Sequence, residues 1–225
     1  MLSKTLLLVL AFGTVVMWGP IFLICRSYRI KSWKSIPIAV LLTIAGTIGT
    51  YILYFIENGQ TGGRSFYGAV FLVPIFFIPI SYLFRVSYVE LLDACAPAEC
   101  VMLAIMKIQC MMDGCCEGRI IYTLSDGIEV RFPSQAVEFV GAILVFTILM
   151  NWGVKHEKKG SLYTWYLLLY GSSRFVLNFF RAAWENVNQT IPIGTVWSLV
   201  AVVMGMAILF ISQNEKRKKN GEKCV

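Results

Sequence analysis

The amino-acid sequence predicts an all-α integral membrane protein with seven transmembrane helices, the N-terminus outside and the C-terminus in the cytoplasm. Of the 225 residues, 57% are hydrophobic and only 15% are charged, which is too apolar for an ordinary soluble domain. Long uncharged runs reach the roughly 20 residues that an α-helix needs to cross a bilayer. Basic residues gather in alternate connecting segments, as expected from their preference for the cytoplasmic side.

The uncharged runs give the predicted spans in chain order. They are 6–25, 36–56, 66–84, 98–112, 136–154, 162–180 and 191–211. The first has a long apolar core and no small-residue cleavage pattern after it, so we expect it to be retained rather than removed as a signal peptide. The fourth is short and carries Glu99 and Lys107. Pro97 predicts the start of its helix, with Asp93 just before it in a capping, pairing or functional role.

The distribution of charge supports an odd number of spans. Most of the 20 Lys and Arg residues fall in the segments that this topology places inside, including the basic cytoplasmic tail at 213–225. If the fourth segment did not cross, the loop around Lys155 and the tail would lie opposite the first loop, and the bias would largely vanish. The net charge of +7 then lies mostly in the cytoplasm, where anionic lipid headgroups explain it without nucleic acid. The whole chain, 1–225, is expected to form a single transmembrane domain.

Four polar residues in the sixth span form a pattern. In YGSSRFVLNFFR, Tyr170, Arg174, Asn178 and Arg181 are spaced by 4, 4 and 3 residues, which places them on one face of a helix. Two guanidinium groups beside a phenol and an amide suit a bound phosphate, since each guanidinium can donate two hydrogen bonds to it. The alternative is that Arg181 reaches the outer interface while Arg174 pairs with a carboxylate such as Glu138.

Two further stretches add polar groups at membrane depth. In KIQCMMDGCCEG, Lys107, Cys110 and Gly114 share one helix face, with Lys107 about two turns from the outer end. In FPSQAVE, Gln135 and Glu138 lie three residues apart at the start of the fifth span. Pro133 and Ser134 signal the start of that helix, and Glu138 is deep enough to need a cationic partner.

The seven cysteines leave several possibilities open. Cys110, Cys115 and Cys116 lack a paired C-x-x-C arrangement, so no metal site is expected. A disulfide across the outer rim remains an alternative if that side is oxidising. No neighbouring base activates any of these thiols as a nucleophile. The other four cysteines are most simply small apolar residues of the core: they are Cys25, Cys95, Cys100 and Cys224.

Four segments in order resemble the prolipoprotein diacylglyceryl transferases, a family of seven-span bacterial membrane enzymes. These segments are GGRSFYGAV, LLDACAPAECVMLAIMKIQCMMDGCCEG, PSQAVEF and YGSSRFVLNFFR. They resemble, in turn, the family's small-residue run around His-Gly-Gly, its Asp-x-x-Ala-Pro helix with the Gly-Arg-x-Gly-Asn-Phe-x-x-Gly signature, Pro-Ser-Gln-Leu-Tyr-Glu, and Tyr-Gly-x-x-Arg-Phe-x-x-Glu-Phe-x-Arg. The resemblance is strongest over 62–181. It implies a location in the bacterial plasma membrane, with room only for a hairpin-sized insert at 120–132.

The resemblance also implies a reaction and a site. Members of the family move the diacylglyceryl group of phosphatidylglycerol to the thiol of a lipobox cysteine in a prolipoprotein, and no cofactor is implied. The positions that would take part in catalysis are Tyr67, Lys107, Tyr170 and Arg174. The positions that would surround the substrate are Gly68, Asp93, Cys110, Gly114, Gln135, Glu138, Asn178 and Arg181.

This sequence departs from the family pattern at four of those positions. Tyr67 replaces a histidine, Lys107 an arginine, Cys110 an asparagine and Asn178 a glutamate. Loss of the histidine removes one general base, so two alternatives stand beside the transferase. One is a phospholipid-binding paralogue without turnover, and the other is a membrane thiol redox protein that uses the three rim cysteines.

Overall fold

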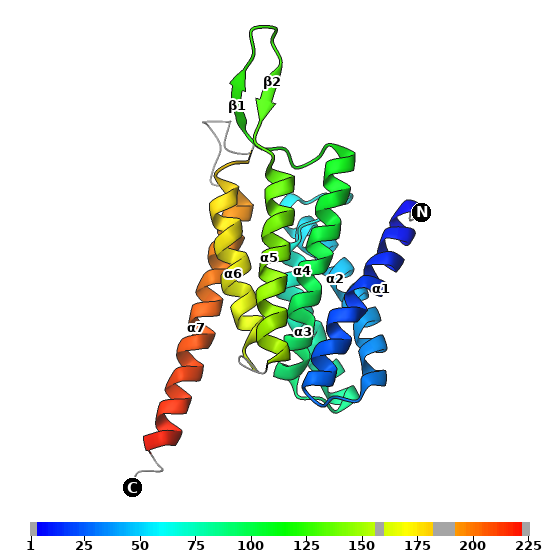
Figure 1. Cartoon of the computed structure of the whole chain (residues 1–225), viewed down its shortest axis with the longest axis vertical. Helices are drawn as coiled ribbons and strands as arrows, with labels where there is room; N and C mark the ends of the chain where they lie inside the picture. The colour runs from blue at the N-terminus through cyan, green and yellow to red at the C-terminus, as the bar shows by residue number, and fades with distance from the viewer. Residues whose placement is uncertain (1–3, 156–159, 182–191, 222–225) are drawn as a thin grey trace.

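The computed structural model describes residues 4–155, 160–181 and 192–221, with side chains from 11 to 214. This part of the chain is a bundle of seven α-helices with one β-hairpin at its end (Figure 1). In order, the elements are α1 Lys4–Ser27, a 3-10 turn Ser32–Lys34, α2 Ser35–Asn58, α3 Tyr67–Phe84, α4 Tyr88–Asp113, β1 Ile120–Thr123, β2 Glu129–Arg131, α5 Ser134–Val154, α6 Leu162–Asn178 and α7 Ile193–Gly221. Each predicted span overlaps one of these helices.

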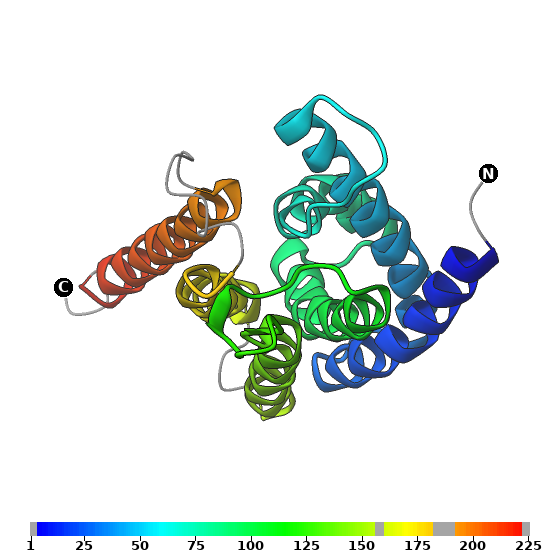
Figure 2. The same cartoon turned by 90° about the horizontal axis from the view of Figure 1, so that it is seen from above.

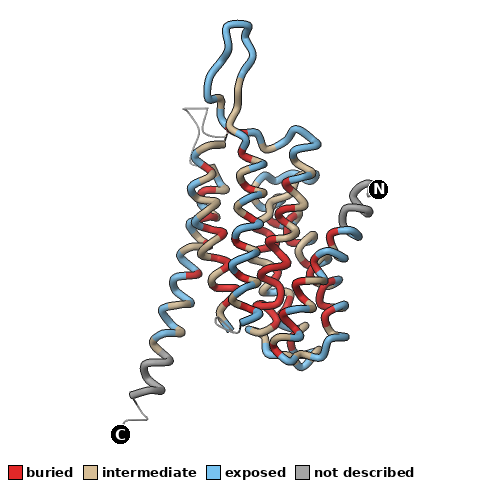
Figure 3. The backbone as a smooth tube through the Cα atoms, viewed as in Figure 1, coloured by how far each residue is buried: buried red, intermediate tan, exposed pale blue. Residues whose placement is uncertain are grey.

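The outer surface of the bundle is suited to lipid. Four helical stretches are long and apolar enough to cross a membrane: Ser32–Asn58, Tyr67–Phe84, Ser134–Val154 and Ile193–Asn214. Large apolar side chains such as Ile44, Ile75 and Leu144 are exposed on them, and exposed and buried positions alternate along the helices (Figure 3). Outside a membrane this surface would be unfavourable. The prediction of an all-α membrane protein is confirmed.

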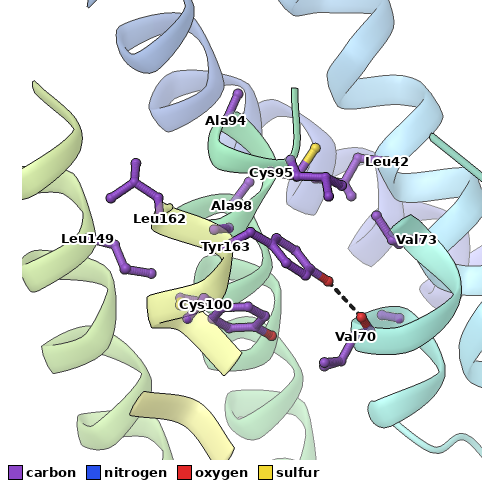
Figure 4. Packing of buried hydrophobic residues seen from close by; sticks show 14 of the residues in the cluster. Leu42, Val70, Val73, Ala94, Cys95, Ala98, Cys100, Leu149, Leu162 and Tyr163 are labelled. Atoms are coloured by element: carbon purple, nitrogen blue, oxygen red, sulfur yellow. Dashed lines mark hydrogen bonds between the residues drawn. The ribbon is translucent and has the colours of Figure 1, made fainter. Parts of the chain in front are cut away.

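Helix α4 is the centre of the bundle. It packs against α1, α3, α5 and α6, and from above it lies between α1 on one side and α5 and α6 on the other (Figure 2). Its small residues Ala94, Cys95 and Ala98 are fully buried and allow neighbouring helices to approach closely. Beside them the Tyr163 hydroxyl of α6 donates a 2.6 Å hydrogen bond to the Val70 carbonyl of α3 (Figure 4).

The start of α4 differs from the prediction. The helix begins at Tyr88 and continues through Pro97, so the prediction that it starts at Pro97 is wrong. An internal proline removes one backbone hydrogen bond, and burial of this segment among four helices compensates for that loss. Asp93 therefore lies inside the helix. Its carboxylate accepts hydrogen bonds from the Tyr28 hydroxyl and from the backbone N–H groups of Gly160 and Tyr163.

Helices α2 and α3 cross at a pair of glycines. A Cβ built on Gly49 would lie 2.5 Å from the carbonyl oxygen of Gly68, which is closer than real atoms approach. The crossing therefore needs glycine at both positions. Because α3 begins at Tyr67, the contact also fixes where Tyr67 projects into the bundle.

The hairpin marks the end of the bundle where the polar residues gather. Strands β1 and β2 pair antiparallel and project beyond the helices, so the expected hairpin-sized insert is present (Figure 1). Helix α4 ends just before it at Gly114, which has a left-handed φ of 65°. The C-terminal ends of α4 and α6 and the N-terminal end of α5 all meet at this end.

Candidate active site

The site is built around a single carboxylate, Glu138, in the second turn of α5. Its side chain is 3% exposed and is surrounded by three cations. Lys107 of α4 lies 2.5 Å from Oε2, Arg174 of α6 forms an ion pair with Oε1, and Arg181 lies 3.4 Å from Oε1. One negative charge thus faces three positive ones, so the cluster as a whole is positive.

The helix stripe predicted from the sequence is only partly present. Tyr170, Arg174 and Asn178 lie on α6, but α6 ends at Asn178 and Arg181 lies beyond it. Arg181 is held instead by an antiparallel bridge to Gly118, and the neighbouring Phe180 carbonyl accepts a hydrogen bond from the Arg119 N–H. The link after α4 therefore positions the second arginine, which helical spacing alone could not show.

A large open hollow lies beside the cation cluster. It measures about 1560 Å³, part of which is open to solvent, and it is lined by residues of the α2–α3 link, the end of α4, the rim after α4, α6 and the start of α7. Lys107, Arg174 and Arg181 all face it, as do Tyr67 and Tyr170. The pairing of Arg174 with Glu138, foreseen as an alternative, is present. It coexists with an opening onto the hollow.

Arg174 keeps hydrogen-bonding capacity after this pairing. Its side chain is 14% exposed, and its Nε–H is buried without a hydrogen-bond acceptor among the described residues. A buried donor without an acceptor costs about 1–3 kcal/mol. Arg174 also lines the hollow, so the part of its side chain that remains exposed can meet an anion there.

A second, apolar pocket adjoins the hollow. It encloses about 490 Å³, and its wall includes Met17, Leu42 and Val73. Arg64, Phe66 and Met106 line both spaces. A polar hollow that leads into an apolar pocket matches the division of a phospholipid into headgroup and acyl chains. Glu99, one of the two charged residues noted in the fourth predicted span, borders the apolar pocket.

Tyr67 is fixed by a hydrogen-bond network to α7. Its hydroxyl lies 2.5 Å from Ser198 Oγ. The Ser198 hydroxyl donates to the Gly194 carbonyl and accepts from Asn178 Nδ2. When the single Ser198 proton is given to the Gly194 carbonyl, Tyr67 is the donor in its own bond. Sequence reasoning missed Ser198, which lies far along the chain and belongs to no motif.

The remaining predicted site residues lie around the hollow or away from it. Asp93 is at the opposite end of α4, about 21 Å from Lys107 at 1.5 Å per residue, and Gly68 packs at the α2–α3 crossing. Gly114 ends α4, and the Gln135 amide donates a 2.8 Å hydrogen bond to the Cys115 carbonyl. Cys110 lines the hollow.

Three thiols converge at the rim of the hollow, although their spacing did not suggest it. The sulfur atoms of Cys110, Cys115 and Cys116 all lie within 4.8 Å of one another. A hydrogen bond from Cys110, together with the positive charges of Lys107 and Arg181, lowers the pKa of the Cys116 thiol. The left-handed turn at Gly114 produces this convergence, and that glycine was the only signal of it in the sequence.

The sequence is similar to a family of known proteins. Residues 6–211 match the family described as prolipoprotein diacylglyceryl transferase. The phosphatidylglycerol–prolipoprotein diacylglyceryl transferase 2 of Clostridium perfringens (strain 13 / Type A) is 23% identical over 213 residues, which cover 84% of this chain and 83% of that protein.

Two proteins named phosphatidylglycerol–prolipoprotein diacylglyceryl transferase are also similar. The one from Actinobacillus pleuropneumoniae serotype 3 (strain JL03) is 29% identical over 77% of this chain and 74% of its own. The one from Dehalococcoides mccartyi (strain ATCC BAA-2266 / KCTC 15142 / 195) is 25% identical over 96% and 91%. Since the match extends over most of its length, the chain belongs to the prolipoprotein diacylglyceryl transferase family.

Proposed function

We propose that this protein transfers the diacylglyceryl group of phosphatidylglycerol to a cysteine thiol of a prolipoprotein. The observation that carries the proposal is the excess of cations around Glu138 at the edge of an open hollow. An anionic headgroup in that hollow balances the charge that one carboxylate leaves unmatched. The names of the relatives point to the same substrates.

The cations have distinct tasks in this proposal. Arg174 and Arg181 hold the phosphate, and Lys107 adds a point charge where the family has an arginine. When the thiol sulfur bonds to the glyceryl carbon, its S–H bond and the bond from that carbon to the phosphate oxygen both break. Glycerol phosphate leaves, and the thiol proton passes to the departing phosphate or to water in the hollow. Negative charge grows on that oxygen during the step, and fixed positive groups stabilise it without having to reorganise. The acyl chains extend into the apolar pocket.

Aromatic and polar neighbours position these cations. Tyr170 packs against Tyr67 with ring centroids 5.7 Å apart and orients the headgroup. Tyr67 acts as a hydrogen-bond donor that links α3 to α7 through Ser198 and Asn178, rather than as a base. Gly68, Asp93, Cys110, Gly114 and Gln135 form the supporting scaffold.

The site opens at the outer face of the bacterial plasma membrane. In this proposal all seven helices cross, the N-terminus is outside, and the basic tail at 213–225 is cytoplasmic. The whole chain, 1–225, forms one domain. Supporting it, α1 begins towards the hairpin end of the bundle whereas α7 ends at the opposite side (Figure 1). A thiol acceptor that has crossed the membrane would meet the hollow directly.

Transfer can be tested with purified components. The protein is incubated with vesicles of phosphatidylglycerol and a lipobox peptide, and the peptide is analysed by mass spectrometry. We expect a gain of one diacylglyceryl unit, lost in Arg174→Gln and kept in Arg131→Gln, which changes a partly exposed hairpin arginine paired with Glu129. Equal transfer from phosphatidylcholine, or undiminished transfer by Arg174→Gln, would contradict the proposal.

A lipid-binding paralogue without turnover is the second candidate. It is favoured by the hydrogen bond of Tyr67, whose proton is directed to Ser198, so no base stands where the family has a histidine. In the same experiment, no mass gain together with phosphatidylglycerol binding that Arg174→Gln abolishes would select this alternative.

A further inference from the structure

The three thiols at the rim of the hollow have the spacing of a metal site. Cys110 Sγ and Cys116 Sγ lie 4.0 Å apart, and all three sulfur atoms fall within 4.8 Å of one another. Two sulfur atoms bound to a tetrahedral zinc ion at about 2.3 Å each are about 3.8 Å apart. We propose that Cys110, Cys115 and Cys116 bind one Zn²⁺ ion.

The backbone already holds the thiols in this arrangement. Gly114 and Cys116 both have left-handed φ angles, of 65° and 62°, and this conformation is unfavourable for a residue with a Cβ. Hydrogen bonds from α5 hold the turn, because Ser134 Oγ donates to the Cys116 carbonyl at 2.7 Å and Gln135 Nε2 donates to the Cys115 carbonyl at 2.8 Å. A site organised before the ion arrives binds it at lower entropic cost.

Charge around the thiols also favours the bound form. Zinc takes deprotonated thiols, so three cysteine ligands bring three negative charges to the site. Lys107 and Arg181 lie within electrostatic reach of Cys116 and offset part of that charge. No other described Cys, His, Asp or Glu side chain groups with these three sulfur atoms, so in this proposal water from the hollow supplies the fourth ligand.

A disulfide is the rival use of the same residues. It would bring two of the sulfur atoms to about 2.05 Å and leave the third cysteine without a role. The zinc site uses all three. It also holds the end of α4, which supplies Lys107, to the turn at Cys115 and Cys116, and this turn accepts hydrogen bonds from the start of α5.

The test uses the full-length protein in detergent micelles, stripped of metal and kept reduced with a phosphine. Zinc chloride is titrated in, and Co²⁺ serves as a spectroscopic probe because thiolate ligands give it an intense charge-transfer absorption. We expect one ion per chain and thiolate bands in the Co²⁺ spectrum. Cys116→Ser should weaken Zn²⁺ binding by about 100-fold. Cys95→Ala, about 22 Å from Cys110 along α4, should bind as the parent does.

The outcomes separate this proposal from the one for lipid transfer. Arg174→Gln is expected to bind Zn²⁺ like the parent even though it loses transfer, and thermal unfolding verifies that each variant is folded. Reduced parent protein that binds no Zn²⁺, or a folded Cys116→Ser variant that binds it equally well, overturns the proposal. A Cys110–Cys116 disulfide in protein isolated without reductant, joined to absent zinc binding after reduction, would establish the redox alternative.

Discussion

At the scale of single residues, Glu138 shows how a carboxylate is tolerated at membrane depth. It is almost fully buried, and Lys107, Arg174 and Arg181 surround it from three directions. A buried charge without partners is strongly destabilising, whereas a buried group with several partners is not. Glu138 therefore holds the three cations together, and those cations in turn hold the carboxylate ionised. The carboxylate and the three cations therefore stabilise one another, and removing any one of them should destabilise the others.

Replacing Glu138 with Gln tests this mutual dependence. The change keeps the shape of the side chain but leaves three cations facing one another, which should lower the free energy of unfolding by about 3 kcal/mol. Thermal unfolding in detergent measures the loss. Added phosphatidylglycerol should restore more stability to Glu138→Gln than to the parent, because the lipid phosphate replaces the missing charge, and phosphatidylcholine should restore less.

The matched control is Glu129→Gln in the hairpin. Glu129 pairs with Arg131 at 2.6 Å, but its side chain is 45% exposed, and exposed ion pairs contribute only about 0–1 kcal/mol. If Glu138→Gln and Glu129→Gln lost the same stability, the Glu138 cluster would contribute no more than an exposed ion pair.

Tyr67→Phe separates a positioning role from a catalytic one. Removing the hydroxyl deletes one hydrogen bond to Ser198, so transfer should fall by less than about tenfold, the equivalent of roughly 1 kcal/mol. A general base contributes about 10²- to 10⁴-fold. A loss in that range in the peptide transfer assay, with Tm unchanged, would show that Tyr67 moves a proton during the reaction.

At the scale of elements, the crossing of α2 and α3 determines where Tyr67 enters the hollow. The crossing depends on Gly49, whose missing Cβ lets the Gly68 carbonyl approach. Gly46 lies one turn earlier on the same helix, and a Cβ there would be 3.7 Å from Ala69, an ordinary contact. The two glycines thus differ in role despite similar positions.

Alanine at these two positions should give opposite results. Gly49→Ala forces the helices apart and should cost about 1–3 kcal/mol, together with part of the transfer activity. Gly46→Ala should be neutral or stabilise by up to about 1 kcal/mol, because alanine is the better helix former. Thermal unfolding of the two variants side by side measures this. Equal stability would mean that the crossing adapts to a methyl group.

The helices could be predicted from the sequence wherever hydrophobicity alone determines their position. All seven predicted spans overlap helices, because an apolar run of that length in a bilayer must form its backbone hydrogen bonds internally, as an α-helix does. The prediction that α4 starts at Pro97 was wrong, because packing against four helices outweighs the one backbone hydrogen bond that the proline removes. Arg181 falls beyond the end of α6, so its approach to Glu138 depends on the bridge to Gly118 and not on helical period.

At the scale of the whole molecule, the site depends on contacts between distant segments. The sequence indicated that Glu138 needs a cation, and that Arg174 could supply one. It could not show that Lys107 and Arg181 share the same carboxylate, or that Ser198 of α7 fixes Tyr67. Spacing argued against grouping the rim cysteines, yet the backbone turn brings them together. These contacts join residues that are distant in the sequence, and local sequence patterns do not reveal them.

The bundle also predicts its orientation in the membrane. Because α1 begins near the hairpin end and α7 finishes at the opposite end (Figure 1), an epitope in the hairpin turn and one at the C-terminus should lie on opposite sides. An epitope inserted at Asp126, an exposed turn residue, should bind antibody on intact spheroplasts. The same epitope after Val225 should bind only after permeabilisation, because basic segments are retained preferentially on the cytoplasmic side. Detection of both epitopes on the same side would require an even number of spans between the hairpin and the C-terminus. The cation cluster and the hollow would still exist, but their access to a secreted thiol would have to be reconsidered.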